Sequence, residues 1–320
     1  MLLQLIPSFA TPWPETCDLP AFRLAHISDL HLPPPPGLEG DFAPKRWLSR
    51  LAWRRKERRH SPEALAAIAA DISAQRPDHI AITGDLTNFS TPQEFAAARR
   101  WLETLGPPQD VTVSPGNHDA LAGASGPERF AAWRPWLADD AGAAFPSLRR
   151  RGRVALINLS SAAPTALHLA QGLLDAPQLQ RLGPLLRGLG EEGLFRILLI
   201  HHPPIAGVVS HRKSLRHGPE LLAILRDCGA ELVLHGHAHV ATVASAPGPQ
   251  GPIPVLGVPS ASARGDHGEP ARWHAIAVEE GENDWTVQVT ARGLEAGGAG
   301  VAELGRYSLS LARAGSASAP

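Results

Sequence analysis

Short runs of apolar and often β-branched residues recur along the chain, and a polar cluster follows each of them directly. Runs of this length and composition are typical of buried strands, so each polar cluster is expected where a strand ends and a loop begins. The pattern indicates a repeating order of strand, helix and strand. The runs that we predict to form these strands are Phe22 to Ile27, His79 to Thr83, Val111 to Val113, Ile197 to Ile200 and Leu232 to Leu234.

The longer segments between these strands carry helix signals. Ser61 and Thr91 can act as N-caps, and Pro62 and Pro92 follow them in the first turn, where proline is favoured. Gly229 is expected to end a later helix, because glycine is common directly after the last helical turn. The helices predicted in this way cover residues 61–75, 92–105, 127–139, 175–188 and 218–228.

After residue 239 the pattern changes to short runs rich in valine and alanine, which are typical of strands. The alternation before this point and the strands after it predict an α/β fold in which two packed mixed β-sheets are flanked by helices. We predict one domain over residues 1–311 and a disordered tail over residues 312–320, which are small and polar. The late strands are predicted at 240–245, 253–258, 272–279 and 284–290.

Composition fits an enzyme of ordinary size. The chain has 320 residues, of which 43% are hydrophobic, and this is enough to bury a substantial core. Its formal net charge is −1 and its pI is close to 7.0, which argues against a general nucleic-acid binder. Nucleic acid is therefore not our first choice of partner.

The cysteines and the first residues bear on the compartment. Cys17 and Cys228 are the two cysteines and form no C-x-x-C motif, so free thiols in a reducing compartment are expected rather than a disulfide. No stretch approaches the roughly 18 to 20 apolar residues of a membrane span. The opening residues 1–10 are apolar but carry no positive charge, and prolines interrupt the region, so no signal peptide is expected. We predict a cytoplasmic protein, with peripheral contact to the inner membrane as an alternative.

The polar clusters that follow the early strands consist of metal-ligand residue types. In an extended chain, residues i and i+2 point the same way, so Asp29 can converge with His31, and His237 with His239. Carboxylate, amide and imidazole ligands without thiolate favour manganese, iron or zinc. Each cluster alone is an ordinary turn, but five in this order predict a two-metal hydrolase. The clusters are Asp29-Leu30-His31, Gly84-Asp85, Gly116-Asn117-His118-Asp119, His201-His202-Pro203 and Gly236-His237-Ala238-His239.

With these clusters the chain resembles the calcineurin-like metallophosphoesterases, whose motifs are D-x-H, G-D, G-N-H-[D/E], H and G-H-x-H. It is most similar to the bacterial class III cyclic-nucleotide and glycerophosphodiester phosphodiesterases, in which strings such as Gly84-Asp85-Leu86-Thr87-Asn88 recur. The resemblance spans residues 29–239. It implies a four-layer α/β/β/α sandwich and two divalent metal ions, which are Mn, Fe or Zn. Within this string Asn88 is left open: it could orient His118, bind phosphate or cap a turn.

The resemblance also implies a role for each motif residue. Asp85 would bridge the two metal ions, and a metal-bridging hydroxide would attack the phosphorus in line. His118 would be the catalytic residue that contacts the phosphate or protonates the leaving oxygen, and Asn117 and His202 would be further substrate contacts. His201 is chosen over His202 as the ligand of the fourth motif. The ligands implied are Asp29, His31, Asp85 and His239 for one ion, and Asp85, Asn117, His201 and His237 for the other.

Residues 41–60 form a basic segment with eight Lys or Arg against two acids, and Trp47, Leu48, Leu51 and Trp53 lie between the charges. If the segment is helical, it is amphipathic, which is typical of elements that lie on a membrane surface. Three interpretations stay open: a solvated helix packed beside the active site, a contact with anionic lipid, or a contact with a phosphate backbone.

The predicted function is hydrolysis of small phosphodiesters. The alternative enzyme is a membrane-surface phospholipid or nucleotide-sugar-lipid hydrolase that uses residues 41–60 to reach its substrate. The alternative without catalysis is an inactive binding scaffold on the same fold, which the complete set of motif residues disfavours. The sequence leaves open the metal, the oligomeric state and the natural substrate, which could be a cyclic nucleotide, a glycerophosphodiester or a lipid head group.

Overall fold

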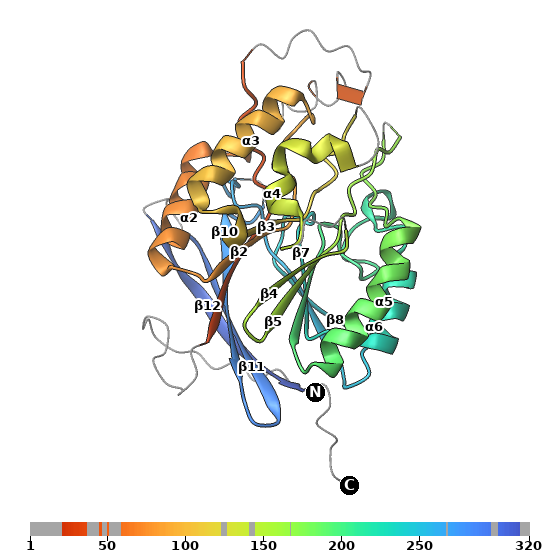
Figure 1. The fold of residues 1–320 in the computed structure, drawn as a ribbon. Coiled ribbons are helices and arrows are strands. Elements are labelled where there is room, and N and C mark those ends of the chain that lie inside the picture. Colours follow the sequence, from red (N-terminus) through yellow and green to blue (C-terminus); the bar gives the residue numbers. More distant parts are fainter. Residues whose placement is uncertain are drawn as a thin grey trace.

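Two six-stranded β-sheets lie face to face in the computed structural model, and helices cover their outer faces (Figure 1). The structure describes residues 21–36, 45–46, 50, 59–122, 127–140, 145–166, 168–266, 268–295 and 300–313. The strand order is β12-β11-β10-β1-β2-β3 in the first sheet and β4-β5-β6-β7-β9-β8 in the second. Both sheets are mixed, as predicted.

The first sheet combines the earliest strands of the chain with the latest. β1 pairs in parallel with β2 and antiparallel with β10, so the strands after residue 270 complete a sheet that begins at residue 22. Its strands are β1 (Phe22–Ile27), β2 (His79–Ile82), β3 (Val111–Val113), β10 (Arg272–Glu280), β11 (Asp284–Leu294) and β12 (Val301–Ala312). The second sheet contains β4 (Ser147–Arg151), β5 (Val154–Asn158), β6 (Phe195–Leu199), β7 (Leu232–His235), β8 (Thr242–Ala246) and β9 (Ile253–Gly257).

Three apolar clusters hold the four layers together. Alternation along β1 illustrates the division, because Leu24 faces the second sheet while Ala25 and Ile27 face the helices. α2 (Pro62–Gln75) and α3 (Pro92–Leu105) pack on the first sheet, and α5 (Ala176–Glu191) and α6 (Gly218–Cys228) pack on the second. The order of layers is therefore helix, sheet, sheet, helix, and the predicted α/β/β/α sandwich is confirmed.

The capped helices begin where the sequence predicts. Ser61 Oγ accepts a hydrogen bond from the Ala64 amide at the start of α2, and Thr91 forms a reciprocal capping box with Glu94 at the start of α3. The segment 127–139 differs from the single helix expected there. It forms a 3₁₀ helix (Pro127–Trp133) that is kinked at Phe130, where the backbone angles are non-helical, and then one turn, α4 (Arg134–Leu137).

Strands β4, β5 and β12 were not predicted. β4 is rich in arginine and resembles a surface segment, but Arg149 is buried and donates to the main-chain carbonyls of Pro108 and Val111. β12 is an edge strand that alternates polar and apolar residues and pairs with β11. It also includes Ala312, which we assigned to the tail; residues 314–320 lie outside the described residues.

Two further predictions concern the cysteines and membrane-spanning helices. Cys228 is a buried free thiol, whereas Cys17 lies outside the described residues. None of the helices in the described part of the chain is both long and apolar enough to cross a membrane.

Candidate metal centre

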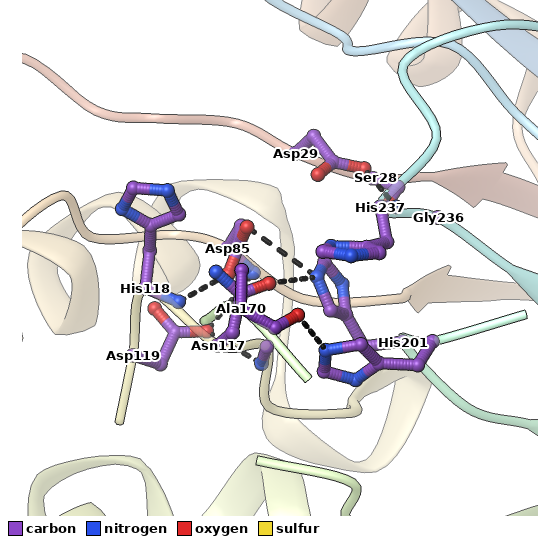
Figure 2. Close-up of polar contacts among 12 residues, drawn as sticks. Ser28, Asp29, Asp85, Asn117, His118, Asp119, Ala170, His201, Gly236 and His237 are labelled. Atoms are coloured by element: carbon purple, nitrogen blue, oxygen red, sulfur yellow. Dashed lines mark hydrogen bonds and ion pairs between the residues drawn. The ribbon is translucent and has the colours of Figure 1, made fainter. Parts of the chain in front are cut away.

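The five predicted clusters meet in the loops that follow β1, β2, β3, β6 and β7. Their ligand atoms form overlapping groups in which all atoms lie within 4.8 Å of one another. Asp29 joins two of these groups, and His201 joins Asp29 and Asp85 to the other histidines; Figure 2 shows Asp29, Asp85, His201 and His237. The groups are Asp29, His31 and His239; Asp29, Asp85 and His201; and His201, His202 and His237.

The centre has two ends that differ in exposure. The open end consists of Asp29, His31 and His239, and the His239 side chain is 40% exposed. The buried end consists of His201 and His237, which are 0% and 4% exposed. Asp85 lies beside the buried end, with its Oδ2 atom 3.3 Å from His201 Nε2.

The backbone brings the ligands together in a conformation that the sequence did not indicate. Asp29 has φ 54° and His31 has φ 43°, so both are left-handed rather than extended, and His237 and His239 follow the same pattern with φ 67° and 58°. Such angles are uncommon outside glycine and cost on the order of 1–3 kcal/mol each. The predicted convergence of i and i+2 is therefore present, but extended geometry is not its cause.

Two glycines are required by close approach between the clusters. A Cβ atom at Gly116 would lie 2.2 Å from Asp85 Oδ1, and a Cβ atom at Gly236 would lie 1.8 Å from Ser28 Oγ. Each glycine therefore lets the backbone of a later cluster lie against the side chains of an earlier one.

Hydrogen bonds orient the histidine rings. His201 Nδ1 donates to Thr83 O at 2.5 Å, and His237 Nε2 donates to Lys213 O at 3.0 Å. A carbonyl oxygen can only accept, so in the neutral form of each ring the second nitrogen carries the lone pair. His201 Nε2 is directed toward Asp85 Oδ2 and Asn117 Oδ1, at 3.3 and 3.2 Å. This arrangement is typical of metal-binding imidazoles.

Asn88 orients a histidine at the open end. Its Oδ1 atom accepts from His31 Nδ1 at 3.1 Å, and its Nδ2 atom donates to Leu32 O at 2.7 Å. His31 Nε2 is thereby directed toward His239 Nε2, 3.4 Å away. The main chain of the same residue accepts from His118 Nδ1 at 2.9 Å. Asn88 thus positions both His31 and His118, a dual role that the sequence alone left open.

The two aspartates hold the loops of the other clusters. Asp29 Oδ2 accepts from the His237 amide at 2.9 Å, and Asp85 Oδ1 accepts from the His118 amide at 2.7 Å. Asp29 Oδ1 is buried and accepts from no main-chain amide in the described part of the chain, and His239 Nε2 lies 3.1 Å from it. A buried carboxylate oxygen that faces an imidazole nitrogen instead of an amide donor fits a site for a cation.

The pKa shifts of the clustered side chains also favour binding of a cation. Burial opposes ionisation of Asp29 and Asp85, but neighbouring histidines outweigh it and lower the pKa of both carboxyl groups. Burial also disfavours charge on His201, yet the Asp85 carboxylate raises the pKa of His201 to about 9. The pKa of His31 and of His237 is lowered, mainly by burial. The carboxylates therefore attract positive charge, while the His31 and His237 imidazoles are neutral and suited to bind metal.

Asp119, to which no separate role was assigned from the sequence, holds two loops of the centre together. Its carboxylate accepts from the amides of Asp85, Gly116 and Thr87, each at 2.9 Å, and from Thr87 Oγ1 at 2.9 Å. Burial and the nearby Asp85 carboxylate raise the pKa of Asp119 to about 7, although these four hydrogen bonds favour the ionised form. Asp119 thus joins the loops after β2 and β3.

His202 is held away from a ligand role. Its Nε2 atom donates to Ala170 O at 3.2 Å, and its Nδ1 atom accepts from Ser161 Oγ at 2.7 Å. Both ring nitrogens are therefore engaged by the protein, although the ring lies close to His201 and His237. This geometry favours His201 as the ligand, and the role of His202 as a substrate contact stays a prediction.

His60 also lies at the centre, and no role was predicted for it from the sequence. Its ring centroid is 4.4 Å from that of His31 and 6.0 Å from that of His239. Burial and His239 lower the pKa of His60 to about 4. His60 closes the basic segment in the sequence, and a β-bridge to Ala263 brings it here. Ala263 is far from His60 in the sequence, so no motif near His60 could have predicted its place at the centre.

Most of the basic segment lies outside the described residues, so its predicted helix is not tested. Lys45 Nζ donates to Thr165 O at 2.8 Å, and Arg46 Nε donates to Phe89 O at 2.8 Å. These two cations are thus bound to loops that follow β5 and β2. The described residues of the segment are Lys45, Arg46, Arg50, Arg59 and His60.

Known proteins share this fold. A dimetal phosphatase from Danio rerio superposes with a TM-score of 0.55 at 12% identity, covering 92% of this chain and 99% of that protein. A purple acid phosphatase from yellow lupin superposes with a TM-score of 0.58, also at 12% identity, covering 94% of this chain and 55% of that protein. At this identity the likeness concerns the fold alone.

Sequence comparisons identify closer relatives. A probable cyclic nucleotide phosphodiesterase of Synechococcus is 28% identical over 281 residues, which are 85% of this chain and 93% of that protein. A cAMP/cGMP dual specificity phosphodiesterase of Mycobacterium tuberculosis is 29% identical over 238 residues, which are 71% of this chain and 64% of that protein. Residues 22–241 match the family model described as calcineurin-like phosphoesterase.

The sandwich and its clustered aspartates and histidines define a metal-dependent phosphoester hydrolase with a dinuclear type of centre. The match over residues 22–241 places the chain more narrowly: it belongs to the calcineurin-like phosphoesterase family. The resemblance drawn from the five motifs is thereby confirmed.

Proposed function

We propose that the protein hydrolyses phosphodiesters, and that cyclic nucleotides are among its substrates. The observation that carries this proposal is the convergence of five loop clusters around the buried Asp29 and Asp85 carboxylates, with Asp29 Oδ1 directed toward His239 Nε2 at 3.1 Å. The names of the relatives support the finer substrate class.

We assign the metal ligands as the sequence motifs imply. Asp29, His31 and His239 would hold one ion, and Asn117, His201 and His237 the other, with Asp85 shared between them. The donor set of carboxylate, amide and imidazole suits Mn, Fe or Zn. Ions at these positions would supply Lewis acidity and a water of lowered pKa, from which a hydroxide is available for in-line attack.

The protein's own groups would bind the diester and stabilise its leaving oxygen. His118 donates from Nδ1 to Asn88 O, and its ring lies on the far side of Asp85 from His201 in Figure 2. This orientation directs Nε2 away from the main chain, where the imidazolium form of the ring can give a proton to the leaving oxygen. The Asn117 side chain, 3.2 Å from His201, would contact the phosphate beside the buried end.

The charge of the centre favours a diester. Asn117 stands where a third carboxylate could have been placed, so Asp29 and Asp85 are the two acidic ligands of the set. Two divalent ions would therefore leave an excess of positive charge at these residues, and this would attract the singly charged phosphodiester. No observation in the described residues favours the membrane-surface alternative, because Lys45 and Arg46 donate to main-chain carbonyls.

The test is hydrolysis of bis-p-nitrophenyl phosphate and of p-nitrophenyl phosphate by the metal-free protein, before and after addition of Mn²⁺, Fe²⁺ or Zn²⁺. We expect metal-dependent turnover with the diester preferred. Preference for the monoester would contradict the phosphodiesterase assignment. Absence of turnover with every metal and both substrates would favour the inactive scaffold.

A further inference from the structure

A cavity of about 250 Å³ lies beside the open end of the metal centre. His31 forms part of its wall, so the cavity and the candidate metal site share a residue. His60, whose ring lies 4.4 Å from that of His31, forms the adjacent part. Pockets for whole small molecules measure roughly 300–1,000 Å³, so this cavity suits one substituent of a substrate.

Main-chain contacts between distant segments build the cavity. The Ser61 amide donates to Ser262 O at 2.7 Å, and the Arg264 amide donates to Arg59 O at 2.9 Å. His60 Nδ1 lies 2.8 Å from Ser262 Oγ, which fixes the imidazole ring. The wall is therefore formed before any ligand binds.

The lining combines apolar surfaces with one cation. Pro33, Pro34 and Leu65 supply apolar surface, and the exposed Arg264 stands at the edge. Among the described residues of the lining there is no Asp or Glu. Glu63 lies next to the lining, but its carboxylate accepts from Ser61 Oγ at 2.6 Å, and this hydrogen bond and the Arg264 charge lower its pKa. The amino end of α2, which starts at Pro62 in this wall, adds partial positive charge.

We propose that this cavity is the subsite for the organic substituent of the phosphodiester, and that it takes a nucleobase rather than a quaternary or primary ammonium group. The inference rests on the proposed function and narrows its substrate class. A flat, neutral heterocycle can pack on proline and leucine and offer ring nitrogens or carbonyl oxygens to Arg264 and His60. A choline or ethanolamine group would meet Arg264 and the end of α2 without an acidic partner in the lining.

Arg264 is the specificity-determining residue in this proposal, and it can be changed without disturbing the metal ligands. Its side chain is exposed and forms no hydrogen bond or ion pair with the described residues, so substitution leaves the fold intact. Arg226 offers a matched control: it is exposed on α6, which packs on the other sheet.

The experiment measures kcat/KM of the metal-loaded enzyme for 3′,5′-cyclic AMP, glycerophosphocholine and methyl p-nitrophenyl phosphate. Arg264→Glu is expected to lower kcat/KM for cyclic AMP by about fivefold or more, mainly through KM, and to raise it for glycerophosphocholine. Turnover of methyl p-nitrophenyl phosphate should change less than turnover of cyclic AMP, because its nitrophenyl ring has no ring nitrogen and offers Arg264 only a weakly accepting nitro group. Arg264→Lys should retain most of the wild-type preference, and Arg226→Glu should retain all of it.

Each outcome decides one of the two proposals. Equal losses on all three substrates, or no change for cyclic AMP, would overturn the subsite. So would a wild-type enzyme that cleaves methyl p-nitrophenyl phosphate but prefers glycerophosphocholine to cyclic AMP, or leaves cyclic AMP intact. A wild-type enzyme that cleaves no diester with any metal would instead overturn the proposed function.

Discussion

The two ends of the metal centre are built differently. At the buried end, His201 and His237 donate to the main-chain carbonyls of Thr83 and Lys213. At the open end, His31 donates to the side chain of Asn88, and His239 is 40% exposed. Main-chain carbonyls orient the first pair, whereas an amide side chain orients His31 and solvent reaches His239. We infer that the buried end fixes the geometry and that the open end exchanges metal and admits substrate.

Removing the carboxylate that joins the two ends should have the largest effect. Asp85→Ala is expected to lower kcat/KM for a diester by about a thousandfold or more, because both ions would lose a ligand and Lewis-acid stabilisation is worth several kcal/mol. Steady-state kinetics with saturating Mn²⁺ provide the measurement. The control is Asp78→Ala. Asp78 directly precedes β2, the strand that Asp85 follows, and its substitution should leave activity unchanged. Wild-type turnover by Asp85→Ala would exclude the bridging assignment.

Chelation should distinguish the ends directly. With limiting chelator, we expect one metal ion per protein to be lost before the second, because the open end is accessible to solvent. An ion present at a hundred times its Kd stabilises the folded state by about 2.7 kcal/mol, so the thermal midpoint should fall in two stages. Metal analysis and calorimetry on the same samples would follow both losses. Loss of both ions in one step would remove the proposed difference between the ends.

Substitution of Asn88, which orients His31, should weaken metal binding selectively at the open end. Asn88→Ala removes the acceptor that orients His31 and is expected to reduce metal affinity about ten- to a hundredfold. The main-chain contact to His118 is retained, so activity should recover at high metal concentration. Isothermal titration of the metal-free variant measures the affinity. Equal weakening of both binding steps would show that the ends are not separable.

The smallest effect is expected for substitution of Ser161, which forms a hydrogen bond with His202. Ser161→Ala removes the hydrogen bond to His202 Nδ1 at 2.7 Å and should lower the free energy of unfolding by about 1–3 kcal/mol. Activity and metal content should stay within about threefold of wild type, since His202 is not assigned as a ligand. A loss as large as that of Asn88→Ala would place His202 in the ligand set after all.

Local signals in the sequence account for much of the fold. Caps at Ser61 and Thr91 were sufficient to predict α2 and α3, because capping depends on residues within one turn. β4 could not be predicted in this way. Its Arg149 is buried only because carbonyls from other segments, including Val111, accept its donors. Such compensation arises in the folded chain and leaves no mark on the local pattern.

The site likewise combines residues that local motifs predict with residues that only long-range contacts bring into place. Asp29, Asp85 and His201 lie in short motifs directly after strands, where sequence and position agree. His60 reaches the centre through its β-bridge to Ala263, so neither local segment indicates its place. The left-handed backbone at the ligand residues was also unforeseen, since it depends on hydrogen bonds between loops, such as that from the Asp29 amide to Gly84 O.

The amides of His118 and His237 have a further use, because each donates to one of the two carboxylates at the centre. A cation drawn to Asp85 or Asp29 shares the oxygen electrons that hold these protons. The chemical shift and exchange rate of each amide proton therefore respond to one carboxylate. Nuclear magnetic resonance could follow the filling of the centre from two backbone signals, one per aspartate, without substrate, dye or mutation.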